Sequence, residues 1–332
     1  MIDPHVHLRD WNESHKMTLE RGLILYQIQG FSYIFEMPNT KPAIISKTLA
    51  LKRIEDANRA IEKNGLLIKH GLYIGLTNQP AQIKEAVDTY QELFPRVVGL
   101  KLYCAGTTGD LKVTDNNSQY NLLKQLSELK YNGVLAVHCE DEGRFYPEKW
   151  NPLIPSSHDL QRPSISELRC VRNILYLSKK SDFKGKLHIC HVSNPNSINE
   201  IESAKNHSDF KITCGITPHH AIYNKEYMDS LNTKDALLLR VNPPIRDRKN
   251  QEQLFQSILD GKVDFIETDF APHTLEEKIN PEINNPYASG IADLSLYHRL
   301  LELLKTQGIL PSEIFRLTHY NIVKTFGLEG LI

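Results

Sequence analysis

Two histidines near the start of the chain, His5 and His7, have the spacing of metal ligands on a strand. Residues two apart on a strand point to the same face, so both imidazoles can bind one metal ion. Two half-exposed histidines on an edge strand would give the same pattern, and the motif alone does not decide between the two interpretations. The decision depends on the polar residues that end other apolar runs.

Lys101 interrupts an apolar run, 97–103, that predicts a buried parallel strand. A buried ammonium group costs free energy unless it has partners. One interpretation is a lysine whose long side chain extends to the end of the strand. The other is that the amine has combined with CO2 to form a carbamate (N6-carboxylated lysine), an anion that can bridge two metal ions.

His138, His191 and Asp269 each follow another apolar run. We expect them at the C-terminal ends of strands, where barrel enzymes place their active sites. His188 lies three residues before His191, and we expect it to face away from His191. A single such residue is commonly a core histidine or a helix cap, but the whole set predicts a metal centre.

Nitrogen and oxygen donors of this kind suit Zn²⁺, although other transition metals also bind them. Two ions that share a hydroxide lower its pKa towards neutrality. Asp269 is placed to take a proton from the attacking hydroxide and to pass it to a leaving nitrogen. The pattern therefore predicts metal-assisted opening or closing of an amide-like bond. We expect two Zn²⁺ ions, one held by His5, His7 and Asp269 and the other by His138 and His191, with the carboxylated Lys101 and the hydroxide as bridges.

The elements that position these residues alternate between short apolar runs and amphipathic segments. Eight strands joined by helices predict an α/β fold of the (β/α)8 TIM-barrel type. No G-x-G-x-x-G motif follows the first strand, which argues against an open doubly wound sheet. We expect one catalytic domain over 1–332, with irregular loops at 144–163 and 224–262. The expected strands are 2–8, 31–37, 68–76, 97–103, 134–139, 186–192, 211–216 and 263–269, and the expected helices include 47–63, 81–94, 119–130, 165–179 and 197–205.

The composition excludes several classes of protein. The 332 residues carry 39 basic and 40 acidic side chains, and a net charge of −1 gives no reason to expect nucleic acid or an anionic membrane as partner. No apolar run is long enough to span a bilayer, and charged residues occupy the place of a signal peptide. Five cysteines are too few, and odd in number, for a disulfide framework. We therefore expect a soluble, cytoplasmic protein.

The ordered motifs resemble the dihydroorotase family of the amidohydrolase superfamily, from residue 3 to about residue 327. The resemblance implies a barrel enzyme that interconverts N-carbamoyl-L-aspartate and L-dihydroorotate in de novo pyrimidine biosynthesis. The motifs that carry it are His5-Val6-His7-Leu8-Arg9-Asp10, Met37-Pro38-Asn39-Thr40, Gly99-Leu100-Lys101-Leu102-Tyr103, His188-Ile189-Cys190-His191-Val192, Thr217-Pro218-His219-His220, Val241-Asn242-Pro243-Pro244-Ile245-Arg246 and Asp269-Phe270-Ala271-Pro272-His273-Thr274.

The resemblance also implies which residues bind the substrate. Arg9 and Asn39 match family residues that bind the substrate α-carboxylate, and an Arg fork with an Asn donor suits that group. His273 matches a family histidine that contacts the substrate. Asn242 matches a substrate contact found in part of the family. The remaining expected contacts, Thr107 and Thr108, resemble a mobile loop that closes over the substrate, although an ordinary polar turn gives the same pattern.

The sequence departs from the family pattern in two respects. Many relatives carry a second, β-sandwich domain around the barrel, and we expect this chain to lack it. One branch holds an additional zinc with a Cys and a Glu. Cys190 matches the Cys, but Gly215 stands in place of the Glu, so we expect no third zinc.

Two other functions remain open on the sequence alone. The same metal centre would serve another cyclic-amide hydrolase, such as an allantoinase or a hydantoinase-like enzyme. An inactive relative that acts as a structural partner of aspartate carbamoyltransferase is the alternative outside enzymes, although such relatives typically lose metal ligands that this chain retains. The resemblance leaves open a homodimer and an association with aspartate carbamoyltransferase.

Overall fold

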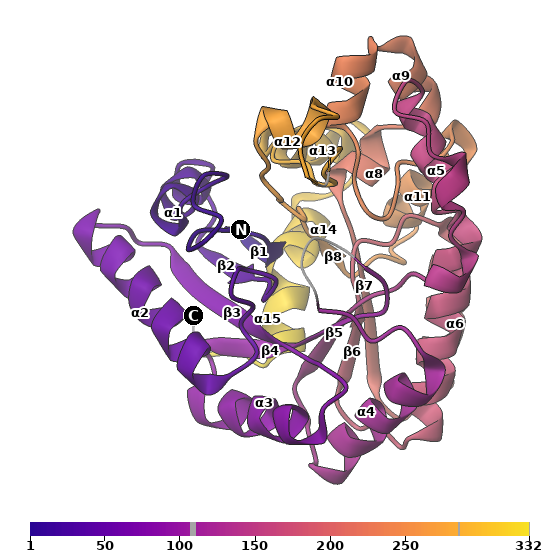
Figure 1. Cartoon of the computed structure of the whole chain (residues 1–332). Coiled ribbons are helices and arrows are strands. Elements are labelled where there is room, and N and C mark those ends of the chain that lie inside the picture. Colours follow the sequence, from indigo (N-terminus) through magenta and orange to yellow (C-terminus); the bar gives the residue numbers. More distant parts are fainter. Residues whose placement is uncertain (107–110, 285, 332) are drawn as a thin grey trace.

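The computed structural model describes residues 1–106, 111–284 and 286–331, and within them eight parallel strands lie side by side in sequence order. A parallel bridge between Val6 and Phe270 joins the two ends of this sheet, and the His7 N–H donates to the Phe270 carbonyl at 2.8 Å. The predicted TIM barrel is confirmed (Figure 1). The strands are β1 (Ile2–Val6), β2 (Tyr33–Glu36), β3 (Lys69–Gly75), β4 (Val97–Tyr103), β5 (Val134–His138), β6 (Lys186–Ile189), β7 (Lys211–Ile216) and β8 (Phe265–Ile266).

Long helices follow the strands and surround them, and several short helices gather at one end, at the top of Figure 1. The long helices are α1 (Leu19–Ile28), α2 (Lys47–Lys63), α3 (Pro80–Leu93), α4 (Asn116–Glu128), α6 (Ser164–Lys180), α7 (Pro195–Lys205), α11 (Arg248–Leu259) and α13 (Ser295–Thr306). The short ones are α5 (His158–Gln161), α8 (Pro218–Ile222), α9 (Lys225–Ser230), α10 (Thr233–Leu238), α12 (Leu275–Ile279), α14 (Pro311–Phe315), α15 (Asn321–Phe326), the 3₁₀ turns η1 (Glu142–Arg144), η2 (Pro147–Lys149) and η3 (Pro155–Ser157), and the π-helical turn η4 (Arg316–Tyr320).

The prediction that 224–262 is irregular was wrong, because this stretch contains α9, α10 and α11. Asp247 caps α11 by accepting a hydrogen bond from the Asn250 N–H at 2.8 Å. Leu254 and Ile258, four residues apart, are buried on its inner face. The other expected loop, 144–163, holds η2, η3 and α5, which are each a single short turn.

Most buried apolar residues form two layers, one between strands and helices and one inside the barrel, and a smaller cluster includes Met228, Ile245 and Leu296. Inside the barrel, Phe326 of α15 packs its ring against Phe35, with the centroids 4.8 Å apart. Ile2 and Phe265, at the beginnings of their strands, belong to the same cluster. Helix α15 therefore fills the N-terminal end of the barrel, and the C-terminal ends of the strands are left for polar residues.

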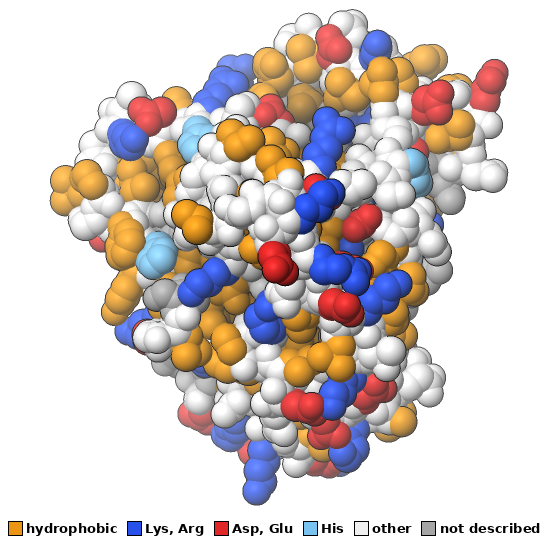
Figure 2. All heavy atoms as spheres, turned by 90° about the vertical axis from the view of Figure 1, so that its left-hand side faces the viewer, with side chains coloured by type: hydrophobic (Ala, Val, Ile, Leu, Met, Phe, Trp, Pro, Cys, Tyr) orange, Lys and Arg blue, Asp and Glu red, His pale blue; other side chains and the backbone are white. Residues whose placement is uncertain are grey.

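The surface in Figure 2 mixes Lys and Arg with Asp and Glu side chains, without a large region of one sign on that face. This agrees with the net charge of −1. In the described part of the chain, no helix is both long and apolar enough to cross a membrane.

Candidate active site

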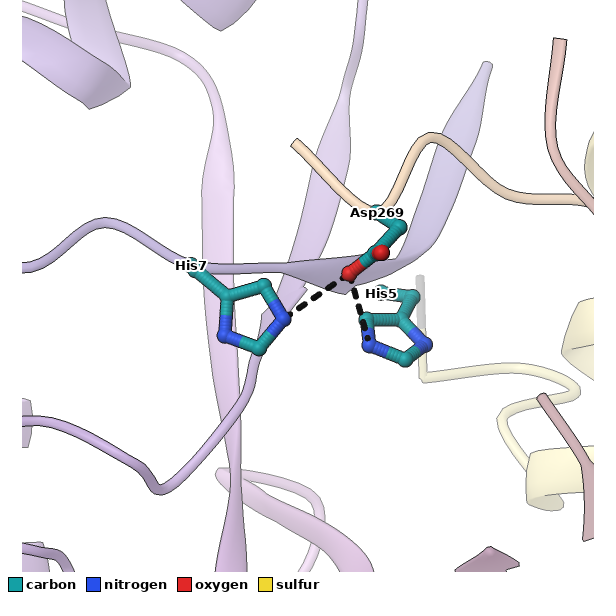
Figure 3. Close-up of side chains that lie close together, drawn as sticks. All are labelled: His5, His7 and Asp269. Atoms are coloured by element: carbon teal, nitrogen blue, oxygen red, sulfur yellow. Dashed lines mark hydrogen bonds and ion pairs between the residues drawn. The ribbon is translucent and has the colours of Figure 1, made fainter. Parts of the chain in front are cut away.

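Three of the predicted metal ligands, His5, His7 and Asp269, converge at the C-terminal mouth of the barrel (Figure 3). Asp269 Oδ1 lies 2.9 Å from His7 Nε2 and 3.3 Å from His5 Nε2. All three side chains are buried, and they come from opposite ends of the sequence because β1 closes the barrel next to β8. One oxygen and two imidazole nitrogens that share one point make a donor set suited to a divalent transition metal.

His138 and His191 form the second predicted pair, at the ends of β5 and β6. Nδ1 of His138 lies 3.1 Å from Nε2 of His191, and both rings are buried. The other ring nitrogen of His138, Nε2, donates to the Glu140 carboxylate at 2.8 Å. Glu140 is in turn paired with Arg162. This arrangement fixes the tautomer of His138 and presents Nδ1 to the site, as a carboxylate behind a metal-binding histidine does.

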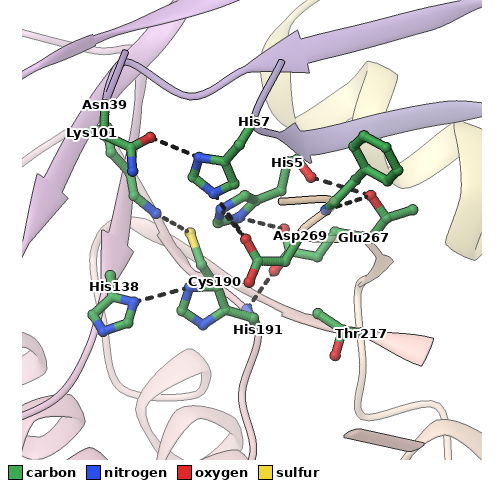
Figure 4. Close-up of polar contacts among 12 residues, drawn as sticks. His5, His7, Asn39, Lys101, His138, Cys190, His191, Thr217, Glu267 and Asp269 are labelled. Atoms are coloured by element: carbon green, nitrogen blue, oxygen red, sulfur yellow. Dashed lines mark hydrogen bonds and ion pairs between the residues drawn. The ribbon is translucent and has the colours of Figure 1, made fainter. Parts of the chain in front are cut away.

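Lys101 is fully buried in β4, and its Nζ lies 3.1 Å from Cys190 Sγ (Figure 4). Among the described residues, no carboxylate lies within ion-pair distance of this ammonium group. Burial opposes ionisation of the Cys190 thiol, but Lys101 and His5 outweigh it and lower the pKa of Cys190 to about 5. A buried lysine whose partners are a thiol and the Tyr103 ring, 4.9 Å from its Nζ, lies beside converging metal donors and fits a lysine that is carboxylated and binds metal.

His191 and Asp269, two and three residues after the ends of β6 and β8, have unusual backbone conformations. Their φ angles are +37° and +48°, in the left-handed region that residues other than glycine rarely adopt. Such strain persists where the surrounding structure holds it, and it is common at functional sites. Both residues therefore turn out of the strand direction at the mouth of the barrel.

Glu267, which the sequence analysis did not predict, lies behind the metal-ligand candidates (Figure 4). Its carboxylate accepts hydrogen bonds from the His191 backbone N–H and from His188 Nε2, the latter at 3.1 Å, and it lies 3.6 Å from His5 Nδ1. His188 supports the site through Glu267 and is not among the described residues that line the cavity.

The charges of these groups are strongly coupled. Burial raises the pKa of Asp269, but the neighbouring His5 and His7 outweigh it and hold that pKa far below its usual value. Burial lowers the pKa of His5, but Cys190 and Asp269 outweigh it and raise that pKa to about 10. The cluster therefore favours an ionised Asp269 facing positive charge, which is the role a metal ion would take.

The expected carboxylate-binding residues line the same cavity. Arg9 is buried, donates from Nε to the Pro272 carbonyl at 3.1 Å, and donates from Nη2 to His273 Nε2 at 3.1 Å. Its Nη1 has no hydrogen-bond partner. The Asn39 amide oxygen accepts from His7 Nδ1 at 2.7 Å, which directs His7 Nε2 towards Asp269. The structure therefore brings Arg9 and Asn39 next to the metal-ligand candidates.

Of the remaining expected substrate contacts, the structure describes Asn242 but not the two threonines. The Asn242 amide lies 2.8 Å from His158 Nε2 and also lines the cavity. Thr107 and Thr108 lie outside the described residues. Tyr103 was not predicted, but it lines the cavity, and its buried hydroxyl has no hydrogen-bond partner.

Curated proteins with similar sequences are dihydroorotases. A dihydroorotase of Macrococcus caseolyticus is 29% identical over 333 residues, which cover 96% of this chain and 73% of the relative. A dihydroorotase of Bacillus cytotoxicus is 29% identical over 337 residues, which cover 99% of this chain and 72% of the relative. The chain is similar to these dihydroorotases over nearly its whole length. Of the residues predicted as metal ligands, five line the cavity at the barrel mouth, and the sixth, Lys101, lies beside Cys190.

Solved structures extend the likeness to the fold. An L-hydantoinase (dihydropyrimidinase) from Arthrobacter aurescens matches with a TM-score of 0.81 and 19% identity, covering 99% of this chain and 71% of that one. A D-hydantoinase (dihydropyrimidinase) from a Thermus species matches with a TM-score of 0.75, 20% identity and the same coverage. At these identities the likeness concerns the barrel alone. No family model matches the chain.

Proposed function

We propose that this chain is a dihydroorotase, which cyclises N-carbamoyl-L-aspartate reversibly to L-dihydroorotate and water in de novo pyrimidine biosynthesis. The observation that carries the proposal is the position of Arg9. Arg9 lines the cavity together with His5, His7 and Asp269, and its buried Nη1 has no hydrogen-bond partner. A cyclic amide that carries a carboxylate next to the ring would place that carboxylate on Arg9 and its reacting carbonyl at the histidines.

The proposed cofactor is a pair of Zn²⁺ ions bridged by a carboxylated Lys101. When bound, the ions would activate water near neutral pH and polarise the reacting carbonyl. The ligands would be His5, His7 and Asp269 on one side and His138 and His191 on the other, with Lys101 between them. The three donors of the first group lie within 4.8 Å of one another, which supports this assignment.

Asp269 is the proposed catalytic residue. Its Oδ1 faces the two histidines, so Oδ2 is left to hold a proton. In ring opening, Asp269 would accept the proton of the attacking water and deliver it to the departing ring nitrogen. In ring closure the same carboxyl group, protonated at the start, would first give its proton to the departing oxygen. The carboxylate would then accept the proton of the carbamoyl nitrogen and pass it to the same oxygen, so that water leaves and Asp269 ends ionised.

The proposed substrate contacts are Arg9 and Asn39 for the α-carboxylate, with Asn242 at the cavity wall, His273 next to Arg9, and Thr107 and Thr108 as further contacts. Arg9 offers a planar pair of N–H groups that matches a carboxylate, whereas a lysine would offer one point charge. Asn39 also fixes His7, so a change there affects both the substrate and a metal ligand.

The test is a comparison of substrates on the zinc-loaded protein. Dihydroorotate and N-carbamoyl-L-aspartate should turn over, and allantoin, hydantoin and 5,6-dihydrouracil should be far slower because they lack the carboxylate that Arg9 binds. Arg9→Gln should remove most of this preference. Faster turnover of hydantoin or allantoin would replace the proposal with the alternative, a hydantoinase-like enzyme or an allantoinase, which the barrel likeness alone would also accommodate.

The wider proposal covers organisation and location: one catalytic domain over residues 1–332, a cytoplasmic enzyme, a homodimer, and an association with aspartate carbamoyltransferase. Light scattering of the chain alone, and then of its mixture with aspartate carbamoyltransferase, tests the last two. A monomer that does not change mass in the mixture would reject both.

A further inference from the structure

Three consecutive residues at the edge of the cavity have left-handed backbones. Arg9, Asp10 and Trp11 have φ angles of +58°, +69° and +48°. None of them is glycine, and each such conformation costs free energy that the surrounding structure must supply. The direction in which the Arg9 side chain leaves the backbone depends on this conformation.

One residue of α2 contacts all three members of this segment. The Arg53 guanidinium donates from Nη2 to the Arg9 carbonyl at 3.0 Å and from Nη1 to the Asp10 carboxylate at 3.3 Å. Its carbon Cζ lies 5.0 Å from the centroid of the Trp11 ring. Arg53 is therefore placed to hold the whole left-handed segment.

Arg53 is itself fixed by a buried anion. Its Nε donates to Glu36 Oε2 at 2.9 Å, and its Nη2 also pairs with Glu36 Oε1. Glu36, on β2, accepts a further hydrogen bond from His70 Nε2 at 2.9 Å. The side chains of Arg53, Glu36 and His70 are all fully buried. Because a paired Arg fork has a defined orientation, the guanidinium cannot turn away from the Arg9 carbonyl without losing Glu36.

The opposite end of Arg9 is held separately, by the Pro272 carbonyl and by His273. These contacts leave the Nη1 of Arg9, a residue that lines the cavity, without a hydrogen-bond partner. The backbone of Arg9 is thus held by Arg53 and its guanidinium by the segment after β8. Both attachments are needed to hold the Arg9 guanidinium in one fixed position.

We propose that Arg53, anchored by Glu36, is a positioning residue that presents Arg9 to the carboxylate of the substrate. This inference rests on the proposed function, because it takes a carboxylate as the group that Arg9 binds. Arg53 does not touch the substrate and acts only through the Arg9–Trp11 segment. A loss of Arg53 should therefore weaken recognition of the carboxylate and leave the metal centre intact.

The test uses the zinc-loaded holoenzyme and the double variant Glu36→Gln/Arg53→Met, which leaves no buried charge without a partner. KM for dihydroorotate should rise at least tenfold, while kcat changes less than threefold and the bound zinc is unchanged. In an Arg9→Gln background the same double substitution should add no further loss in kcat/KM, because its effect passes through Arg9. Lys205→Met/Asp264→Asn, at another partly buried ion pair, is the matched control and should leave KM unchanged.

Arg53→Lys is the second variant, should the double variant fail to fold. Lysine keeps the charge opposite Glu36, but its single nitrogen cannot also bind both Arg9 and Asp10, so KM should again rise. An unchanged KM in these variants, or an equal loss in the Arg9→Gln background, overturns the inference. A wild-type holoenzyme that neither binds nor converts dihydroorotate overturns the proposed function instead, so the two failures are distinct.

Discussion

The carboxylate of Glu267 occupies the space that a side chain on Gly215 would need. A Cβ atom built on Gly215 would lie 3.0 Å from Glu267 Cγ and still closer to its carboxylate. Gly215 lies on β7 and Glu267 directly follows β8, the neighbouring strand. The family resemblance indicated that Gly215 replaces a glutamate that one branch of the family has at this position. The structure supplies a carboxylate at the same place from the next strand, beside Cys190 and His5, with which it forms a second group of donors within 4.8 Å.

This packing predicts that Gly215→Ala destabilises the fold by about 1–3 kcal/mol, because the added methyl group overlaps Glu267 in a closed core. Urea unfolding measures the loss. In a Glu267→Ala background the overlap disappears, so the same Gly215→Ala change should cost clearly less, and the two substitutions should not be additive. Equal costs in both backgrounds would contradict the proposed overlap.

Glu140 should control metal affinity through His138, with which it forms a 2.8 Å hydrogen bond. Glu140→Gln removes the charge that orients the imidazole, so we expect a 10–100-fold weaker affinity for zinc. Competition with a chromogenic chelator measures it. Glu148→Gln, at an exposed position nearby in the sequence, is the control and should bind zinc like the wild type. Unchanged affinity in Glu140→Gln would remove Glu140 from the metal site.

The proposed carboxylation of Lys101 predicts that activity depends on carbon dioxide. If its carbamate bridges the ions, metal-free protein should recover activity with zinc only when bicarbonate is also present, and recovery should be faster at higher bicarbonate. Lys101→Ala should lose at least a hundredfold in turnover and should not respond to bicarbonate. Full recovery of the wild type in buffer depleted of CO2 would show that the lysine acts unmodified.

The sequence predicted the barrel and the residues at its mouth because strand periodicity and polar strand ends are local signals. It missed Tyr103, Glu140 and Glu267, although each lies two positions from a predicted ligand and so on the same side of its strand or strand extension. Their roles depend on neighbours distant in the sequence, such as Arg162 beside Glu140. The error at 224–262 has a different cause, because its prolines masked the amphipathic pattern of α11.

His273 should take part in substrate binding with its imidazole ring uncharged. Burial lowers the pKa of His273 to about 3, and nearby Arg9 adds to this effect. Its Nδ1, 3.3 Å from the Glu277 carboxylate, then carries the proton, and Nε2 accepts from Arg9. His273→Ala should raise KM for dihydroorotate about tenfold, which corresponds to about 1.4 kcal/mol. His273→Gln keeps an acceptor and should lose less, and a larger loss in the Gln variant would contradict the assigned tautomer.

Glu36 should make the fold sensitive to acid. Burial alone raises the pKa of Glu36, but Arg53 and His70 outweigh it and lower that pKa to about 2, from 4.5 for an ordinary glutamate. Because the unfolded chain takes up the proton first as the pH falls, the stabilisation is complete above about pH 4.5 and is lost between there and pH 2. The shift corresponds to roughly 3 kcal/mol. The difference in unfolding free energy between wild type and Glu36→Gln should therefore be largest near neutral pH and shrink below pH 4.5. A difference that stays constant down to pH 2.5 would mean that the Glu36 carboxylate contributes no ionic stabilisation, and that the loss in the variant comes from packing alone.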